Sequence, residues 1–577
     1  MTAFHDRRDD AAKVGPVGST GPRGGEGASA PCGTPGTKRL ALAEGGARLD
    51  GSRGRVSASG PGRRPGPTLL LIAVGLAMAA DAPPAAKPSK LPFTVSRETT
   101  HITEPLRADG APDYAAALEA MASEGVTPEN NAAVLYWRAF GPKEIDAKSR
   151  PELFRKLGIE VLPDEGDYLV ALRDVAGDAA LQKLYVRMDA AMKEPWTSAD
   201  EPVLAEWLQR NRKPLDLIVE GTRRPKYYQP LLVTSEPPLL VAVLLPLVQE
   251  SRDSARLLSL RAMQRLGEGK IVEAQEDLLA CHRLARHIAS GPMLIDRLVG
   301  IAIDSIACTA DAALAHHDGL SAKQAIAYRA RLAELPPPAS MADAMDRTER
   351  YQYLDLVVYF ARYGVRSLFG DLDSPPSTIA TLASRTIDWD VPLRHGNAYY
   401  DALAEAGRAP TRAERRRKIE EIENRLQSES GRVRDPRWIA ARAFLSPNLR
   451  QTNGEHAAAI LLGLLAPALS AAYTAEDRAT MRFDLTQLAF ALAAYRAERG
   501  EYPAELAQLA PRYIPAVPND LFNDQPLKYL RAGDRYLLYS VGPNGKDDEA
   551  RTYDSKPPAD DHVIVSPKPE PKPKAKP

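Results

Sequence analysis

The chain is long, electrically balanced and poor in cysteine. Its 577 residues include 75 Lys and Arg against 75 Asp and Glu, so the formal net charge is zero, and only 3 residues are Cys. This balance gives no electrostatic case for a nucleic-acid partner, and the length supports a sizeable buried core.

The first part of the chain has a composition that opposes folding. Residues 1–62 are rich in Gly, Pro, Arg and Ser and show no apolar period. Such a segment cannot bury enough apolar surface to offset the loss of chain entropy. We therefore predict disorder over residues 1–62.

A short apolar run follows. Arg63 and Arg64 precede residues 68–79, which are apolar and end in small residues at Ala77-Met78-Ala79. The order of a basic, an apolar and a small-residue part is typical of a secretory signal peptide. We predict a signal peptide over residues 63–82, cleaved after Ala79 or nearby.

Signal peptides normally begin within a few residues of the start of a protein. The long segment ahead of this one therefore indicates a start further in, for example at Val56. An uncleaved signal is the alternative, with residues 68–79 as an anchor in the inner membrane. That anchor is the only membrane contact that we expect, and residues 83–91 are predicted to be a linker.

The bulk of the chain, residues 92–450, has helical patterns. Apolar residues recur at helical spacing between Pro and Gly punctuation in the stretches 130–140, 201–221, 236–266, 271–289, 292–317 and 321–335. Convincing strands are absent, so we predict one α-helical domain or two packed subdomains. Residues 255–288 resemble a tetratricopeptide-type helical hairpin, although the ~34-residue recurrence of such arrays is missing.

The reactive side chains of this region follow no familiar catalytic motif. His-Glu-x-x-His, Gly-x-Ser-x-Gly, a P-loop and paired Cys-x-x-Cys are missing. His282 and His287 are five residues apart and point about 140° apart on an ideal helix, so we predict surface or helix-end roles rather than a shared metal. Cys281 and Cys308 either pair after export or remain buried thiols, and buried thiols are the simpler reading.

The C-terminal region changes character. A helical pattern from residue 482 ends at Gly500, which suits a left-handed C-cap, and Pro503 prevents its resumption. Two β-prone runs follow at residues 527–530 and 536–541, and Gly533-Asp534 between them suits a tight hairpin turn. We predict a small module in which a helix packs on a short antiparallel sheet.

An ordered set of residues in this module resembles the C-terminal globular head of type II secretion major pseudopilins. The set consists of Ala494-Tyr495, Gly500-Glu501-Tyr502-Pro503, Leu506, Leu509, Pro511, Tyr513, Val517-Pro518-Asn519-Asp520, Pro526-Leu527-Lys528-Tyr529 and Tyr539-Ser540-Val541-Gly542-Pro543-Asn544-Gly545. The match covers about ninety residues. Leu521 and Asp524 depart from the family, which commonly has Pro and Gly there.

The resemblance implies a calcium ion in the loop after the last strand, and calcium prefers several oxygen ligands. Carried over by position, the candidate ligands are Ser540, Asn544, Asp547, Asp548, Asp560 and Asp561. Asn544 stands where the family usually has Asp, which lowers the ligand charge. The alternative is that these acids simply solvate a surface loop.

An apolar stretch at residues 456–473 leads into the module, much as a pilin's N-terminal helix leads into its head. Here it is internal and contains Pro467, so we predict a buried core helix and no filament subunit. The predicted module spans residues 456–565. Residues 566–577 are rich in Pro and Lys and are predicted to form an extended tail.

Together these patterns predict a mainly α protein that ends in a small α+β module resembling a pseudopilin head. The function that we predict is non-enzymatic: an exported, periplasmic or cell-envelope interaction or assembly protein with protein partners and a calcium site. The alternatives are an exported enzyme with a pocket in the helical domain and a helical-solenoid binding protein. The oligomeric state is left open.

Overall fold

The computed structural model describes residues 91–566 except 176–177, 236–237, 365–385, 434–436, 438–440, 443–444, 553–554 and 556–557. The segments predicted to be disordered at residues 1–62, to be a signal peptide at 63–82, and to be a tail after residue 566 lie outside the described residues, as does nearly all of the predicted linker.

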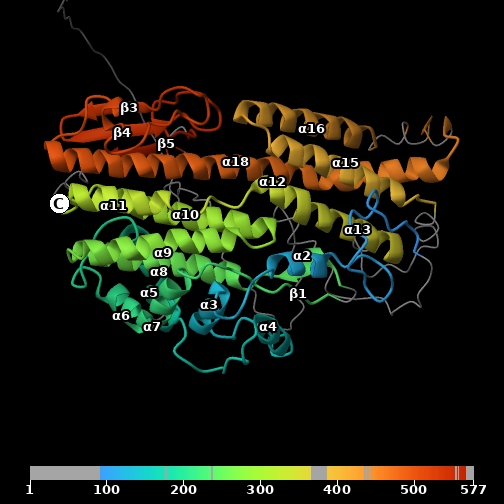
Figure 1. Cartoon of the computed structure of the whole chain (residues 1–577), viewed down its shortest axis with the longest axis horizontal. Coiled ribbons are helices and arrows are strands. Elements are labelled where there is room, and N and C mark those ends of the chain that lie inside the picture. Colours follow the sequence, from blue (N-terminus) through green and yellow to red (C-terminus); the bar gives the residue numbers. More distant parts are fainter. Residues whose placement is uncertain are drawn as a thin grey trace, which may run out of the picture. The chain divides into compact units, whose positions relative to one another are not determined.

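The described chain is mainly helical, as the sequence predicts (Figure 1). Its α-helices are α2 (Tyr114–Ala122), α3 (Ala132–Phe140), α4 (Arg150–Leu157), α5 (Asp178–Ala191), α6 (Pro202–Arg210), α7 (Arg212–Gly221), α8 (Leu247–Gly267), α9 (Ile271–Ala289), α10 (Leu294–Ala315), α11 (Ala322–Ala333), α12 (Met341–Ala344), α13 (Arg350–Tyr363), α15 (Asp390–Gly407), α16 (Arg412–Val433) and α18 (Leu449–Arg499). Short 3-10 or π turns occupy Leu172–Asp174, Leu240–Ala242, Met345–Glu349 and Leu506–Leu509.

Two of the predicted helices are divided. The stretch 201–221 breaks at Asn211, whose buried side chain bonds the backbone N–H and carbonyl of Val170, at 2.8 and 3.0 Å. The stretch 236–266 is helical only from Leu247, because Leu232–Val233 (β1) pairs with Val243–Leu244 (β2) ahead of it. The expectation that residues 92–450 contain no strand was therefore wrong, although each strand has only two residues.

Helices α8, α9, α10 and α11 lie side by side (Figure 1). The contact between α9 and α10 is tight at Gly300, where a Cβ atom would lie 2.7 Å from the carbonyl oxygen of Ala285. Among the described helices, only α10 is long and apolar enough to cross a membrane. Its buried acids Asp304 and Asp311 both bond a histidine of α9, which identifies it as a core helix.

Helix α18 is the longest described element, at 51 residues or about 75 Å. The side chain of Asn448 caps its start by accepting from the backbone N–H of Gln451, and Gly500 ends it with a positive φ of 80°, as predicted. It runs without a break through Pro467, and the predicted helix over residues 456–473 is part of it. The predicted burial of this stretch holds at Leu461 and Leu462, which are buried.

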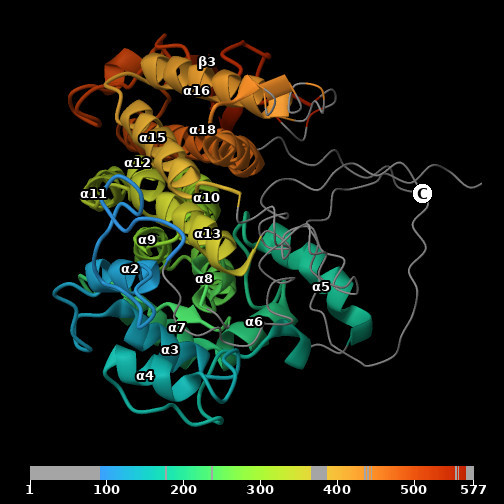
Figure 2. The same ribbon diagram turned by 90° about the vertical axis from the view of Figure 1, so that its right-hand side faces the viewer.

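Two apolar cores share α18. One core joins α3, α8–α11 and the C-terminal half of α18 to the sheet that follows it. The other joins the chain near Phe93, α13, α15 and α16 to the N-terminal half of α18. In Figure 2, α18 lies between α16 and α10. The boundary predicted near residues 450–456 therefore does not separate two cores, because one core contains side chains from Ala132 to Leu538.

The C-terminal sheet has three antiparallel strands in the order β3-β4-β5. Strands β3 (Lys528–Ala532) and β4 (Arg535–Ser540) form the predicted hairpin, and Gly533 in its turn has a φ of 64°. Strand β5 (His562–Ser566) was missed by the sequence analysis. The sheet covers the face of α18 opposite to α10 and α11 (Figure 1), with Tyr536 and Leu538 of β4 buried in the shared core.

Candidate functional site

The loop between β4 and β5 brings three of the predicted ligands together. Carboxylate oxygens of Asp548, Asp560 and Asp561 lie within 4.8 Å of one another. Asp560 and Asp561 directly precede β5, and Asp548 lies in the loop that leaves β4. Because β5 pairs with β4, the sheet register brings these two segments side by side. We call these three residues the acid cluster.

Asp561 is the most unusual member of the acid cluster. Its side chain is buried, with 3% of the residue exposed, and neither carboxylate oxygen has a hydrogen bond to a described residue. Burial raises the pKa of Asp561, and the nearby charges of Asp548 and Asp547 raise it further. The backbone N–H groups of Asp548 and Ala550 face the carboxylate and partly offset this rise, without reaching hydrogen-bond geometry. A buried carboxylate whose charge is only partly compensated is costly, so this position favours a cation.

Asn544 lies beside the acid cluster. Its side-chain amide donates to Asp548 Oδ2 at 2.8 Å, and its backbone N–H donates to Asp560 Oδ2 at 3.1 Å. Its own Oδ1 accepts from the backbone N–H of Lys546 at 2.6 Å. In this arrangement Asn544 holds two of the acids in place, and its amide oxygen is already used by the loop.

The other two predicted ligands have different partners. Asp547 pairs with Lys528 at 3.1 Å and accepts from the Tyr539 hydroxyl at 3.0 Å. The hydroxyl of Ser540 donates to Asp520 Oδ1 at 3.0 Å. Asp520 is buried and also accepts from the backbone N–H of Val541 at 2.8 Å, so it fastens the preceding loop to the end of β4. Ser540 and Asp547 are thus bonded to residues outside the acid cluster.

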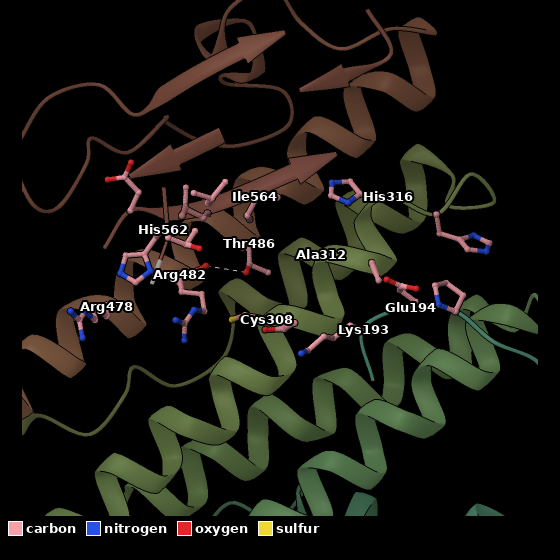
Figure 3. Close-up of a pocket in the computed structure, with 18 of the residues that line it drawn as sticks. Lys193, Glu194, Cys308, Ala312, His316, Arg478, Arg482, Thr486, His562 and Ile564 are labelled. Carbon is pink, nitrogen blue, oxygen red and sulfur yellow. Dashed lines mark hydrogen bonds between the residues drawn. The ribbon is translucent and has the colours of Figure 1, made fainter. Parts of the chain in front are cut away.

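A cleft of about 970 Å³ adjoins the acid cluster, between α10, α18 and β5. Asp560 and Asp561 line it, together with Arg478, Arg482 and His562 (Figure 3). Burial, helped by the charges of Arg482 and Arg478, lowers the pKa of His562 to about 4, so the imidazole is neutral at pH 7. Its Nε2 atom is buried and has no hydrogen bond to a described residue.

Cys308 lies at the floor of this cleft. Burial raises its pKa well above the ordinary value, and Asp304 and Asp311 add to the effect. Cys281 is also buried with a raised pKa, and the two thiols are free. A thiol with a raised pKa is a poor nucleophile, so both cysteines fit the predicted role of buried thiols.

A buried polar network lies beneath the cleft and was missed by the sequence analysis. His282 of α9 is fully buried, with Nδ1 2.8 Å from Asp304 Oδ1 and Nε2 2.8 Å from Asp311 Oδ2 on α10. Arg286 donates to Asp304 at 3.0 Å, and the Tyr328 hydroxyl donates to Asp311 at 2.9 Å. We call these five residues the histidine network.

Burial alone would lower the pKa of His282, but Asp304 and Asp311 outweigh it and raise the pKa to about 9. The protonated ring and Arg286 then balance the two carboxylates. His282, Asp304 and Cys308 have the spacing of a metal site. However, both ring nitrogens of His282 already have carboxylate partners. The positive charges of His282 and Arg286 balance the two carboxylates, so no excess negative charge favours a metal ion there.

The predicted surface or helix-end role was therefore wrong for His282. His287 lies in the last turn of α9, at a helix end as predicted, and is half-buried, with Nδ1 2.7 Å from the Tyr136 hydroxyl. Burial lowers the pKa of His287 to about 4. A signal was present in the sequence. Asp304 and Asp311 are seven residues apart, which places both on one face of an otherwise apolar helix and indicates a buried partner.

Compared with known protein families, curated proteins and solved structures, the chain matches none.

Proposed function

We propose that the protein is an exported, non-enzymatic component of the cell envelope, whose C-terminal module resembles a pseudopilin head and binds a calcium ion at the acid cluster. The observation that carries the calcium proposal is the buried carboxylate of Asp561, which has two acid neighbours and no hydrogen bond to any residue that the structure describes. Calcium accepts six to eight oxygen ligands in flexible geometry, and carboxylates and free carbonyls supply them.

The architecture supports the resemblance. A long helix carries a three-stranded antiparallel sheet on one face, and the acid loop joins the last two strands. The loop approaches Asp560 so closely that only glycine fits at position 542, because a Cβ atom there would lie 2.1 Å from the Asp560 carbonyl oxygen. A cation at the acid cluster would tie the start of β5 to the loop and so fix one edge of the sheet.

A non-enzymatic role is supported by the state of the reactive groups in the helical region. The buried thiols of Cys281 and Cys308 have raised pKa values. Both ring nitrogens of His282 are held by carboxylates. These groups therefore contribute to the packing of α9 and α10 rather than to a reaction. The role that we assign to the protein is the binding of other envelope proteins.

The test is a thermal melt of the metal-free full chain with and without calcium. Binding to the native state stabilises it by RT ln(1 + [L]/Kd), or about 2.7 kcal/mol at a hundredfold excess over Kd. Asp561→Asn should abolish this gain, because it removes the charge and keeps the shape. Asp547→Asn is the matched control in the same loop and should retain most of the gain, since Asp547 pairs with Lys528.

The metal-free protein supplies a second readout. The raised pKa of Asp561 means that the ionised side chain destabilises the fold, so stability should increase as pH falls through the folded pKa of this group. Calcium should suppress this dependence. The same calcium shift in wild type and Asp561→Asn, or no shift in either, would refute the assignment.

A further inference from the structure

A second cleft, of about 950 Å³, lies on the helical part of the chain away from the acid cluster. It is formed by the segment after α7, the C-terminal half of α9 and the end of α11. Its lining is strongly basic: six cationic side chains, Arg223, Arg224, Lys226, Arg283, Arg286 and Arg331, face two acidic ones, Glu124 and Glu334. This excess stands out in a chain whose net charge is zero. We call it the basic cleft.

Three of these arginines act electrostatically on one carboxylate, Glu276, and two of them form ion pairs with it. Arg331 pairs with Glu276 at 2.6 Å, and Arg223 lies 3.6 Å from the same group. Arg283 has neither an ion pair nor a hydrogen bond with any described residue. Burial lowers the pKa of Arg283, and the neighbouring charges of Arg331 and Arg223 lower it too, against the opposite effect of Glu276. Glu276 therefore pairs with two of the three guanidinium groups, and Arg283 has no paired carboxylate among the described residues.

Arg224 adds to the imbalance. It donates to the backbone carbonyls of Pro128 and Asn131 at 2.8 and 2.9 Å, and these acceptors fix its position without neutralising its charge. Burial lowers its pKa, while Glu220 and Glu129 act on it only at longer range. Arg286 is the exception, because Asp304 of the histidine network compensates it at 3.0 Å.

One wall of the basic cleft is flat and neutral. The rings of Tyr227 and His287 are stacked, with an interplanar angle of 7° and centroids 6.1 Å apart. His287 is fixed by Tyr136 and is neutral at pH 7, because burial lowers its pKa to about 4. The histidine therefore contributes a surface and no positive charge.

We propose that the basic cleft binds a phosphate group, with Arg283 as its central ligand and Arg223, Arg224 and Arg331 around it. Guanidinium groups present paired N–H donors whose geometry matches the oxygens of a phosphate. A dianion supplies the charge that Glu276 alone does not. Binding also relieves the repulsion between Arg283 and its neighbours, which favours an anion over a neutral ligand.

The experiment measures binding of inorganic phosphate to the full chain by calorimetry, with sodium chloride at equal ionic strength as the reference. Arg283→Gln should weaken binding by about tenfold, the loss of a charge-assisted contact. Arg478→Gln, in the cleft beside the acid cluster, is the matched control and should bind as the wild type does. Without phosphate, Arg283→Gln should melt at the same temperature as the wild type or above it, since it removes like-charge repulsion.

A second arm distinguishes a soluble phosphate from a lipid headgroup. Vesicles of phosphatidylcholine with and without phosphatidic acid are sedimented with wild type and Arg283→Gln. Binding of phosphate alone assigns a soluble ligand, whereas binding only to the phosphatidic acid vesicles, lost in Arg283→Gln, assigns a headgroup. Equal affinity of wild type and Arg283→Gln in both arms, or no binding in either, overturns the proposal.

Discussion

The histidine network should make the protein less stable as pH rises into the alkaline range. The pKa of His282 is 6.5 in an unfolded chain and about 9 in the folded protein. A raised pKa means that the folded state holds its proton more tightly than the unfolded state. Its contribution is fully present below pH 6.5 and is lost as pH rises through about 9.

The magnitude follows from the shift. At pH 7 the unfolded histidine is mostly neutral, and two pKa units separate pH 7 from the folded value of about 9. Each unit corresponds to about 1.4 kcal/mol, so the proton on His282 contributes about 3 kcal/mol to the free energy of unfolding at pH 7. His282→Gln should lose this amount, because it leaves Asp304 and Asp311 without their shared cation.

The assay is urea denaturation of wild type and His282→Gln at pH 7 and again above about pH 9.5. The difference between the two proteins should shrink at the higher pH, since the wild-type histidine is then neutral too. Taking the difference cancels the other groups that titrate in this range. His287→Gln is the matched control on the same helix. The pKa of His287 is lowered to about 4, so this group affects the pH dependence of stability only between about pH 4 and 6.5. The difference in unfolding free energy between wild type and His287→Gln should therefore be the same at pH 7 and above about pH 9.5. A difference between wild type and His282→Gln that stays the same at both pH values would refute the assigned protonation of the network.

Three further predictions test other parts of the structure. Tyr328→Phe removes the 2.9 Å hydrogen bond to Asp311 and should lower the free energy of unfolding by roughly 1–3 kcal/mol, measured by the same denaturation; an unchanged value would mean that this bond adds nothing to the network. At Gly542, a φ of 69° and a Cβ position 2.1 Å from the Asp560 carbonyl oxygen both oppose a side chain. Gly542→Ala should therefore lower the melting temperature more than Gly545→Ala, because Gly545 has the same φ but no neighbour closer than 3.8 Å. Equal effects at the two glycines would contradict the close approach of the loop to Asp560. N-terminal sequencing of the protein from its native host should begin at Ala80 or Pro83, and recovery of residues 1–60 in the exported protein would rule out the predicted signal peptide.

Local features of the fold were predictable from the sequence because their causes are local. The positive φ of Gly500 ends α18 where the sequence places a C-cap, and Gly533-Asp534 turns the hairpin between β3 and β4. Helical spacing predicted the bodies of α9, α10 and α11 to within a few residues, since amphipathic periodicity reflects the burial of one face. Strand β5 was missed because it comes after an irregular acid-rich loop, where no turn signal marks its pairing with β4.

The candidate site was predictable only in part, because it depends on contacts between segments that are apart in the sequence. The sequence placed the acids in the segment after the predicted hairpin, and it named Asp548, Asp560 and Asp561 among six candidates. The tertiary structure decided which carboxylates meet, that Asp547 pairs with Lys528 of β3, and that Asp561 is buried with no hydrogen bond to a described residue.

The roles of His282 and Pro467 show the same division between local and tertiary information. Considered on α9 alone, His282 is a polar residue without a partner, and the packing of α10 supplies two carboxylates that set its charge. A proline inside a helix removes one backbone hydrogen bond and so opposes helix continuity on local grounds. Helix α18 nevertheless continues through Pro467, with apolar cores packed against its two halves. The sequence by itself determined composition, periodicity and turns, because these depend on neighbours along the chain. Burial, charge state and ligand grouping were decided by the tertiary structure, because they depend on contacts between segments far apart in the sequence.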